Sequence, residues 1–228
     1  MMTLNQPYYQ DEAVTLYLGD CLEVTDWLEA DVLVTDPPYG IGWESGRTSH
    51  AITPLVVAVE GDADVGVRDA ALKLWGDSRP AMVFGSWRQP RPLGTKHRLI
   101  WHKTQTKPGF RTSAFYPAEE EVYVLGSGFV GDPIQNVFAT DEHRDGASGL
   151  VARVGHPTPK PVSLMERLIV KCPPGVIADP FAGSGSTLVA AKQLGRRAIG
   201  VELDEAYCEL IARRLDQGVL NFDAKEAI

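Results

Sequence analysis

The alternation of apolar and polar residues along this chain predicts an α/β fold, in which helices cover a mostly parallel sheet. Short apolar runs alternate with segments whose apolar residues recur every three or four positions, as on one face of a helix. The chain has 228 residues, of which 44% are hydrophobic and 23% charged, values typical of a globular domain. Neither an internal repeat nor a long Gly/Ser linker divides it. We therefore expect a single α/β domain spanning residues 1–228.

Seven short apolar segments, rich in Val, Ile, Leu and aromatic residues, are predicted as strands. They are residues 14–18, 31–35, 81–86, 98–102, 121–125, 176–179 and 198–202. Four segments with helical spacing of apolar residues are predicted as helices, namely residues 65–75, 161–171, 186–194 and 205–215. Residues 42–62 and 126–155 have no clear period, and loops this long in a compact domain are usually functional or mobile. We expect both to be surface segments that close over a ligand.

The charge of the chain is unevenly distributed. The net charge is −8, but residues 79–118 hold eight Lys or Arg and no Asp or Glu. An acidic body with one basic sector is typical of a protein that meets a polyanion on one face. Chance clustering around two solvated loops explains the charge equally well. If the polyanion is DNA, the residues expected to contact it are Arg88, Arg91, Lys107 and Arg111, together with Trp43 from the loop at residues 42–62.

Cysteine usage and hydropathy indicate the compartment. Cys21, Cys172 and Cys208 are odd in number and widely separated, which disfavours a disulfide framework and favours a reducing cytosol. They form no Cys-x-x-Cys pair and no cluster with His, so we expect neither a structural zinc nor any other metal. No apolar run reaches the roughly 18 residues of a membrane helix, and no secretion signal is visible. We expect a cytoplasmic protein with no membrane association.

The first motif with chemical content follows the predicted strand 176–179. It reads Asp179-Pro180-Phe181-Ala182-Gly183-Ser184-Gly185-Ser186-Thr187 and opens a predicted helix. A Gly-rich turn between a strand and a helix lets a ligand approach the backbone closely, and Glu202 at the end of the next strand suits a pair of ribose hydroxyls. The spacing fits neither the dinucleotide nor the nucleoside triphosphate fingerprint. Such turns also occur without ligands, but the glycines together with the spaced acid favour a binding site.

The second motif is Asp36-Pro37-Pro38-Tyr39, at the end of the predicted strand 31–35. Two prolines fix the backbone and remove two donors, leaving rigid carbonyls beside an acidic side chain. Asp36 and the Pro37 carbonyl can accept both hydrogens of an exocyclic amine, and Tyr39 offers a face on which a base can stack. Taken alone, the motif is also compatible with a Pro-rich surface turn.

Together, the two motifs resemble those of the amino-group DNA methyltransferases that use S-adenosylmethionine. Residues 36–39 match the D-P-P-Y catalytic motif of that family, and residues 179–187 match its F-x-G-x-G cofactor motif. The order of the motifs resembles the β-group of the family. Residues 156–161 resemble its H-P-T-x-K-P segment, Gly19-Asp20 the acid that meets the cofactor adenine, and residues 99–103 the strand before the recognition region.

The resemblance implies a seven-stranded Rossmann-like methyltransferase sheet that is circularly permuted, with the last strand antiparallel. Residues 1–125 would be the catalytic half, 126–155 a short target-recognition loop and 156–228 the cofactor-binding half. Permutation also implies that the two ends of the chain lie close together.

The resemblance further implies a role for each motif residue. In the catalytic motif, Asp36 and Pro37 would align the exocyclic amine, Pro38 would stiffen the turn, and Tyr39 would stack on a base flipped out of the duplex. The residues expected to hold S-adenosylmethionine are Asp20, Thr158, Lys160, Asp179, Phe181, Gly183, Gly185, Thr187 and Glu202.

The expected activity is methylation of adenine N6 in double-stranded DNA, because cytosine-N4 relatives more often begin the catalytic motif with Ser. Three alternatives stay open: a cytosine-N4 enzyme, an RNA or free-nucleotide methyltransferase, and a non-catalytic descendant of such enzymes. Family habit suggests a bacterial cell or a phage-infected host. The sequence leaves monomer and homodimer open, as well as the choice between a solitary enzyme and one of a restriction-modification pair; no endonuclease partner can be inferred.

Overall fold

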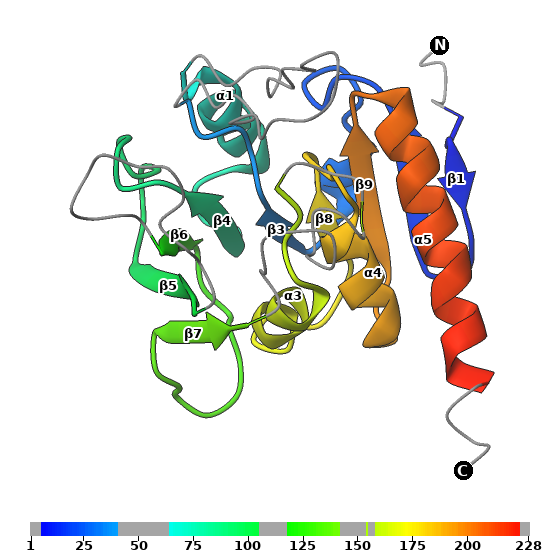
Figure 1. The fold of residues 1–228 in the computed structure, drawn as a ribbon. Helices are drawn as coiled ribbons and strands as arrows, with labels where there is room; N and C mark the ends of the chain where they lie inside the picture. The colour runs from blue at the N-terminus through cyan, green and yellow to red at the C-terminus, as the bar shows by residue number, and fades with distance from the viewer. Residues whose placement is uncertain (1–5, 41–63, 105–117, 142–153, 155–157, 224–228) are drawn as a thin grey trace, which may run out of the picture.

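The computed structural model describes residues 6–40, 64–104, 118–141, 154 and 158–223. Its strands are β1 (Tyr9–Gln10), β2 (Val14–Leu18), β3 (Val32–Thr35), β4 (Ala81–Gly85), β5 (His97–Lys103), β6 (Glu119–Leu125), β7 (Val137–Thr140), β8 (Ile177–Asp179) and β9 (Ala198–Glu202). Its helices are the 3-10 turn η1 (Asp26–Glu29), α1 (Gly66–Trp75), α3 (Val162–Ile169), α4 (Ser186–Gln193) and α5 (Glu205–Asp223). Among the described residues, the strands form one sheet in the order β1-β2-β9-β8-β3-β4-β6-β5-β7 (Figure 1).

The seven predicted strands are all present, each with ends within two residues of the prediction. The predicted count of seven is nevertheless too low, because β1 and β7 extend the sheet at its two edges. β1 has only two residues, and β7 lies within the segment 126–155, for which the sequence predicts an irregular loop. Both are short edge strands whose sequences carry little periodic signal. The antiparallel strand inside the sheet is β6, between β4 and β5, whereas β9, the last strand along the chain, is parallel to β2 and β8.

The sheet is buried on both faces because successive side chains of its central strands point in opposite directions. Val32 and Val34 of β3 belong to a core cluster that also holds buried residues of α3, α4 and α5, whereas Leu33 belongs to a second cluster with Trp27 of η1 and Trp75 of α1. The apolar β3 sequence therefore serves both cores. The result is a three-layer arrangement with α3, α4 and α5 on one face and α1 and η1 on the other.

The middle of the sheet contains a topological switch point. β3 pairs in parallel with β4 on one side and with β8 on the other, while β8 in turn pairs with β9. The chain thus leaves β3 and β8 in opposite directions. In open α/β sheets, ligands bind at the carboxyl ends of the strands beside such a point. Both sequence motifs begin there, since Asp36 follows β3 and Asp179 ends β8.

The N-terminal strands pack against the C-terminal helix. β2 pairs in parallel with β9, and β1 lies beside α5 (Figure 1). The Tyr9 hydroxyl donates a hydrogen bond of 3.0 Å to Asp216, and the Lys192 ammonium lies 2.6 Å from Asp11. Elements from both ends of the described chain therefore share one edge of the sheet, an arrangement compatible with permutation, which stays a prediction. In the described part of the chain, no helix combines the length and apolar character needed to cross a membrane.

Candidate catalytic and cofactor site

Asp36 lies at the carboxyl end of the central strand β3, with its side chain 23% exposed. One carboxylate oxygen, Oδ1, accepts a hydrogen bond of 2.8 Å from the Tyr39 hydroxyl. The other, Oδ2, forms an ion pair with the ammonium of Lys160, which precedes α3 and is 6% exposed. The catalytic motif and the residue predicted to hold the cofactor carboxylate are thus in direct contact.

A second carboxylate, Glu120 at the start of β6, completes this cluster. Its Oε2 accepts a hydrogen bond of 2.7 Å from the Tyr39 hydroxyl and lies 3.2 Å from the Lys160 nitrogen. Its Oε1 forms an ion pair with Lys103, the last residue of β5. We define Asp36, Tyr39, Lys103, Glu120 and Lys160 as the charged cluster. Because β6 runs antiparallel to β4, its first residues lie beside the carboxyl ends of β4 and β3, where Asp36 is located.

Glu120 and Lys103 were missed by the sequence predictions. The only signal for Glu120 is the run Glu119-Glu120-Glu121 ahead of an apolar segment, and the strand that the sequence predicts begins at residue 121. The side chains alternate along β6: Glu120 contacts the catalytic motif, whereas the buried Glu121 pairs with Arg98 at 2.8 Å and accepts a hydrogen bond from Tyr123. Sequence alone does not identify which of three neighbouring carboxylates faces the site.

Burial and charge act in opposite directions on the two carboxyls. Burial raises the pKa of Asp36, and the attraction of Lys160 only partly offsets it. Burial also acts to raise the pKa of Glu120, but Lys160 and Lys103 outweigh it, so that the pKa of Glu120 lies well below its usual range. Burial and both carboxylates raise the pKa of Tyr39, which therefore keeps its proton. Glu120 is thus the more firmly ionised of the two carboxyls.

Three aromatic rings surround the Lys160 ammonium. The nitrogen lies 5.1 Å from the ring centroid of Phe84, 5.5 Å from that of Tyr39 and 5.9 Å from that of Trp101. Such cation–π contacts stabilise a charged ammonium that has lost most of its water. Although burial lowers the pKa of Lys160, its two carboxylate partners outweigh this and raise it. Lys160 is therefore a charged residue within the site.

The Gly-rich turn is held by Glu202. The backbone N–H of Gly183 donates a hydrogen bond of 2.6 Å to Glu202 Oε2, and that of Asp204 donates one of 2.9 Å to Oε1. Gly183 and Gly185 have φ angles of 52° and 75°, which favour glycine. A Cβ atom at Gly185 would lie 2.8 Å from Ile211 of α5. The lack of a side chain at Gly185 therefore makes room for the packing of α5 against the start of α4.

Asp179 connects the two motifs. It is 2% exposed, and its Oδ1 accepts hydrogen bonds of 2.7 Å from the Thr35 hydroxyl and 3.3 Å from the Phe181 backbone. Burial raises the pKa of Asp179 to about 7, against the effect of hydrogen bonds from Thr187 and Thr35. Because Thr35 immediately precedes Asp36, this bond joins the end of β3 to the end of β8.

The remaining residues predicted to hold the cofactor lie along the same edge. The Gly19 N–H donates to the Glu202 backbone carbonyl at 2.9 Å, which places Asp20 beside the end of β9, where its own Oδ1 accepts the Leu22 N–H at 2.8 Å. Thr158 is half-buried, two residues before Lys160. Thr187 is buried in the first turn of α4, and Phe181 packs against the core on the α1 side. The rest of the H-P-T-x-K-P match, at residues 156 and 157, lies outside the described residues.

These donors and acceptors fit S-adenosylmethionine. A carboxylate offers about four lone-pair positions, more than the backbone N–H groups of Gly183, Leu203 and Asp204 occupy on Glu202, so it can still accept from a ribose hydroxyl. Glu202 is half-buried and Asp20 is exposed, so a ligand can reach both. Burial raises the pKa of Glu202, while the backbone hydrogen bonds favour its ionised form. In the described ranges, no group of three His, Cys, Asp or Glu residues is placed to hold a metal ion.

Several residues of the basic sector contact other side chains of the fold. Arg79 stacks on Trp75 with its guanidinium carbon 3.4 Å from the ring centroid, and Arg98 and Lys103 pair with glutamates. Arg88 and Arg91 are exposed on the loop between β4 and β5, and Gln89 of this loop donates a hydrogen bond to the Gly40 carbonyl just beyond the catalytic motif. Trp43, Lys107 and Arg111 lie outside the described residues.

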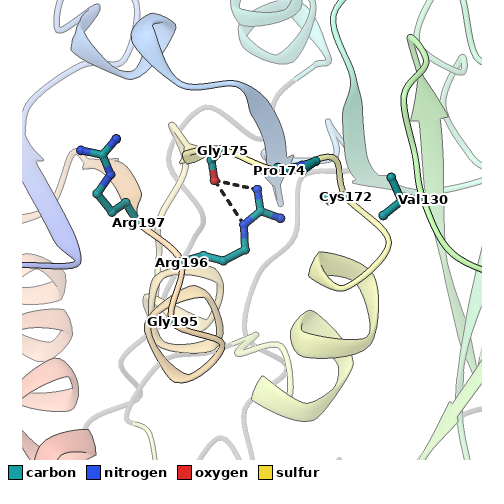
Figure 2. Close-up of a pocket in the computed structure, with 7 residues that line it drawn as sticks. All are labelled: Val130, Cys172, Pro174, Gly175, Gly195, Arg196 and Arg197. Atoms are coloured by element: carbon teal, nitrogen blue, oxygen red, sulfur yellow. Dashed lines mark hydrogen bonds between the residues drawn. The ribbon is translucent and has the colours of Figure 1, made fainter.

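A surface hollow lies at the amino ends of β8 and β9, at the opposite end of these strands from the two motifs (Figure 2). It is lined by Val130, Cys172, Pro174, Gly175, Gly195, Arg196 and Arg197. The Arg196 guanidinium donates to the backbone carbonyls of Gly175 and Pro173, both at 2.6 Å. Arg196 therefore stabilises the loop before β8. None of the predicted site residues lines this hollow.

Known proteins resemble this chain over most of its length. Residues 130–213 match the model of a family described as DNA methylase. The Escherichia coli (strain K12) protein "Putative methylase YubD" is 30% identical, with 90% of this chain and 94% of that protein covered. The type II methyltransferase M.ScaI of Streptomyces caespitosus is 28% identical, with 93% and 84% covered.

Solved structures share the fold. The crystal structure of the M1.HpyAVI–SAM complex has a TM-score of 0.63 at 20% identity, covering 89% of this chain and 99% of that one. The cytosine-N4-specific PvuII DNA methyltransferase has a TM-score of 0.65 at 17% identity, covering 92% and 89%. Given the family match and the identity to YubD over nearly all of both chains, this chain belongs to the N6/N4 family of DNA methylases, which use S-adenosylmethionine as the methyl donor.

Proposed function

We propose that this chain methylates the exocyclic N6 amine of an adenine that is flipped out of double-stranded DNA. The proposal is supported chiefly by the position of Asp36, whose partly exposed carboxylate ends the central strand next to Pro37. The Thr35–Asp179 hydrogen bond of 2.7 Å holds this carboxylate close to the Gly-rich turn. A methyl acceptor and a methyl donor can therefore meet at the switch point between β3 and β8.

The amine of adenine is a poor nucleophile because its lone pair is delocalised into the ring. Asp36 and the Pro37 carbonyl would each accept one of its two N–H hydrogens, which favours a pyramidal nitrogen with an available lone pair. Alignment and fixed electrostatics would thus provide most of the rate acceleration. The target atom cannot be reached in a stacked duplex, so the base must leave the helix, and Tyr39 would stack on it.

The cofactor would lie along the ends of β2, β9 and β8. When bound, S-adenosylmethionine supplies an electrophilic methyl group on a sulfonium. Glu202 would accept from its ribose hydroxyls, Asp20 would meet its adenine, and the turn from Phe181 to Gly185 would follow its methionyl part. Asp179 and Thr187 would hold the shape of that turn. Thr158 and Lys160 are assigned to the cofactor carboxylate by resemblance alone, since Lys160 pairs with Asp36 and Glu120 in the structure.

A cytosine-N4 activity is the second candidate. It is favoured by the similarity to the PvuII enzyme, which is cytosine-N4-specific, although at 17% identity this likeness concerns the fold. Adenine is preferred here because Asp, rather than Ser, begins the catalytic motif. Both activities require the same geometry, because both targets are exocyclic amines.

Incubation with labelled S-adenosylmethionine and plasmid DNA, followed by nucleoside analysis, tests the proposal. We expect label in N6-methyladenine. Label in N4-methylcytosine would establish the second candidate instead, and unlabelled DNA from folded, cofactor-binding protein would point to a non-catalytic descendant. RNA and free nucleotides, offered in parallel, test the remaining substrate classes.

A further inference from the structure

Asp36 and Glu120 share their donors. The Tyr39 hydroxyl lies 2.8 Å from Asp36 Oδ1 and 2.7 Å from Glu120 Oε2. The Lys160 ammonium contacts Asp36 Oδ2 and lies 3.2 Å from the same Glu120 oxygen. Each donor that the described residues provide to Asp36 can therefore turn to Glu120 with little movement.

The hydrogens available on these donors limit what the cluster can do. An ammonium has three hydrogens and can serve both carboxylates at once, but a tyrosine hydroxyl has one and can serve only one carboxylate at a time. When both carboxyls are ionised, the hydroxyl of Tyr39 donates its hydrogen either to Asp36 or to Glu120. The cluster therefore has two arrangements that differ in which carboxylate holds Tyr39.

Which carboxylate accepts the Tyr39 hydroxyl matters for methyl transfer, and the inference that follows rests on the proposed function. Both oxygens of Asp36 already have an internal donor, whereas alignment of the target amine requires Asp36 to accept a substrate N–H. Asp36 still has free lone pairs for this N–H, but every added donor draws on the same carboxylate charge, so the hydrogen bonds from Tyr39 and Lys160 weaken. A donor that leaves Asp36 needs another acceptor, because a donor without a partner in a largely buried site would cost as much as a broken hydrogen bond. Glu120 is the acceptor that can take it.

We propose that Glu120 is a positioning residue that takes over the Tyr39 hydroxyl, and keeps its pairing with the Lys160 ammonium, when Asp36 accepts an N–H of the target amine. It acts through these two residues and does not itself touch the substrate. Lys103 supports this role by pairing with the other oxygen of Glu120, which fixes the carboxylate. Because Lys103 and Lys160 also lower the pKa of Glu120, it remains a charged acceptor throughout.

The test compares Glu120→Gln with Glu121→Gln. The two glutamates are neighbours on β6, and both side chains have a basic partner and a tyrosine hydroxyl partner, but Glu121 pairs with Arg98 and Tyr123 instead of the catalytic motif. The measurements are the single-turnover rate of methyl transfer at saturating cofactor and DNA, its pH profile, the affinity for S-adenosylmethionine and the thermal unfolding temperature. The matched control separates a positioning role from the general cost of altering a buried carboxylate.

We expect Glu120→Gln to lower the single-turnover rate by about 10- to 100-fold, the usual cost of a misplaced reacting group. Cofactor affinity should change little. The charged or titratable groups that face Asp36 are Lys160, Tyr39, Glu120 and Asp179, with Lys103 behind Glu120. The negative charge of Glu120 raises the pKa of Asp36, so replacing Glu120 with a neutral glutamine should lower that pKa. The acidic limb of the rate profile should therefore move to lower pH. Glu121→Gln should leave both the rate and the limb unchanged.

The outcomes are distinguishable from failure of the proposed function. If the wild-type protein methylates DNA and Glu120→Gln matches its rate and pH limb, the inference is wrong while the function stands. Equal losses in Glu120→Gln and Glu121→Gln also overturn it, because they indicate a structural role. If Glu120→Gln does not fold, Glu120→Asp replaces it. That variant keeps the charge but shortens the reach to Tyr39, so a wild-type rate would overturn the inference and a reduced rate in folded protein would support it.

Discussion

Two aspartates at the ends of neighbouring parallel strands are held by different kinds of donor. Asp179 is 2% exposed and accepts hydrogen bonds from the Thr35 hydroxyl and the Phe181 backbone, which are neutral donors fixed by the sheet and the turn. Asp36 is 23% exposed and is contacted by the ends of two long side chains, Tyr39 and Lys160. Backbone donors and hydroxyls on short side chains connect the two strands rigidly, whereas donors at the ends of long side chains can be exchanged for a substrate.

The same contrast extends to the two sides of the site. On the cofactor side, Glu202 is held by backbone N–H groups of Gly183 and Asp204. On the catalytic side, Glu120 is held by two lysines and a tyrosine. Burial acts to raise the pKa of all four carboxyls, so burial does not distinguish the two sides. The two sides differ instead in their donors, which are backbone N–H groups on the cofactor side and lysine and tyrosine side chains on the catalytic side. The following variants test this difference.

The largest effect is expected from Asp36→Ala. Loss of the carboxylate removes one of the two acceptors for the target amine, and removal of one preorganised electrostatic contact costs about 10²- to 10³-fold in rate. Affinity for S-adenosylmethionine should be nearly unchanged, because the backbone-held cofactor side does not depend on Asp36. Single-turnover methylation and calorimetry measure the two quantities. A rate within a few-fold of wild type would exclude Asp36 from catalysis.

Asp179→Asn tests whether Asp179 is a buried, protonated residue that connects the ends of β3 and β8. Its raised pKa means that the folded protein keeps this proton between about pH 4 and pH 7 while the unfolded chain releases it, so wild-type stability falls as pH rises across that window. The fall from this group is on the order of 4 kcal/mol. An asparagine cannot ionise, so the variant should lose this dependence.

Denaturant unfolding of Asp179→Asn and wild type from pH 4 to pH 7 measures the difference between the two slopes. Asp77→Asn, a change at an exposed carboxylate, is the matched control and should leave the wild-type slope in place. Parallel slopes for Asp179→Asn and wild type would contradict the account of Asp179 as a buried, protonated residue that connects the two strands.

Glu202→Ala tests the cofactor side directly. We expect S-adenosylmethionine to bind more weakly by about 1–3 kcal/mol, the typical cost of losing hydrogen bonds to a charged group. Part of this loss will come from the Gly183 N–H, which loses its acceptor and no longer fixes the turn. Calorimetry gives the change, with Glu205→Ala on the exposed first turn of α5 as the control. Unchanged affinity would remove Glu202 from the binding site.

Much of the fold, but only part of the site, could be predicted from the sequence. The seven strands and the ends of β3 and β8 were predictable because apolar runs of the right length are bounded by Pro and Gly. The charged cluster was not, because it depends on β6 entering the sheet antiparallel between β4 and β5, which brings Glu120 to Asp36 across 84 positions of the chain. No local pattern contains that information.

Two further differences have local physical reasons. The sequence predicts that the glycine at position 185 leaves room for a ligand, which stays a prediction, and the structure adds that its missing Cβ makes room for Ile211 of α5. Among the eight basic residues between positions 79 and 118, Arg79, Arg98 and Lys103 have partners within the fold. A count of charges cannot separate such residues from those that face solvent.

The smallest effect is expected from the charges of the loop between β4 and β5. Arg88 and Arg91 are exposed there; Arg88 lies over the ring of Trp87, and neither arginine belongs to an ion pair among the described residues. Because arginines that bind phosphates read no base information, changing both to Gln should weaken binding about equally for cognate and unrelated duplexes. The salt dependence of DNA affinity should flatten by a slope of about 0.9 for each duplex phosphate that is no longer neutralised.

A salt titration of the Arg88→Gln/Arg91→Gln variant, on one duplex with the target base and one without, measures both effects. Arg213→Gln is the control, since it removes an exposed arginine from α5 on the cofactor side. We expect the control to retain the wild-type slope, and both proteins to retain cofactor affinity. Extending the change to Lys107 and Arg111 should flatten the slope further. If the loop variant keeps the wild-type slope, the duplex lies elsewhere, and the charges of the catalytic side act only within the protein.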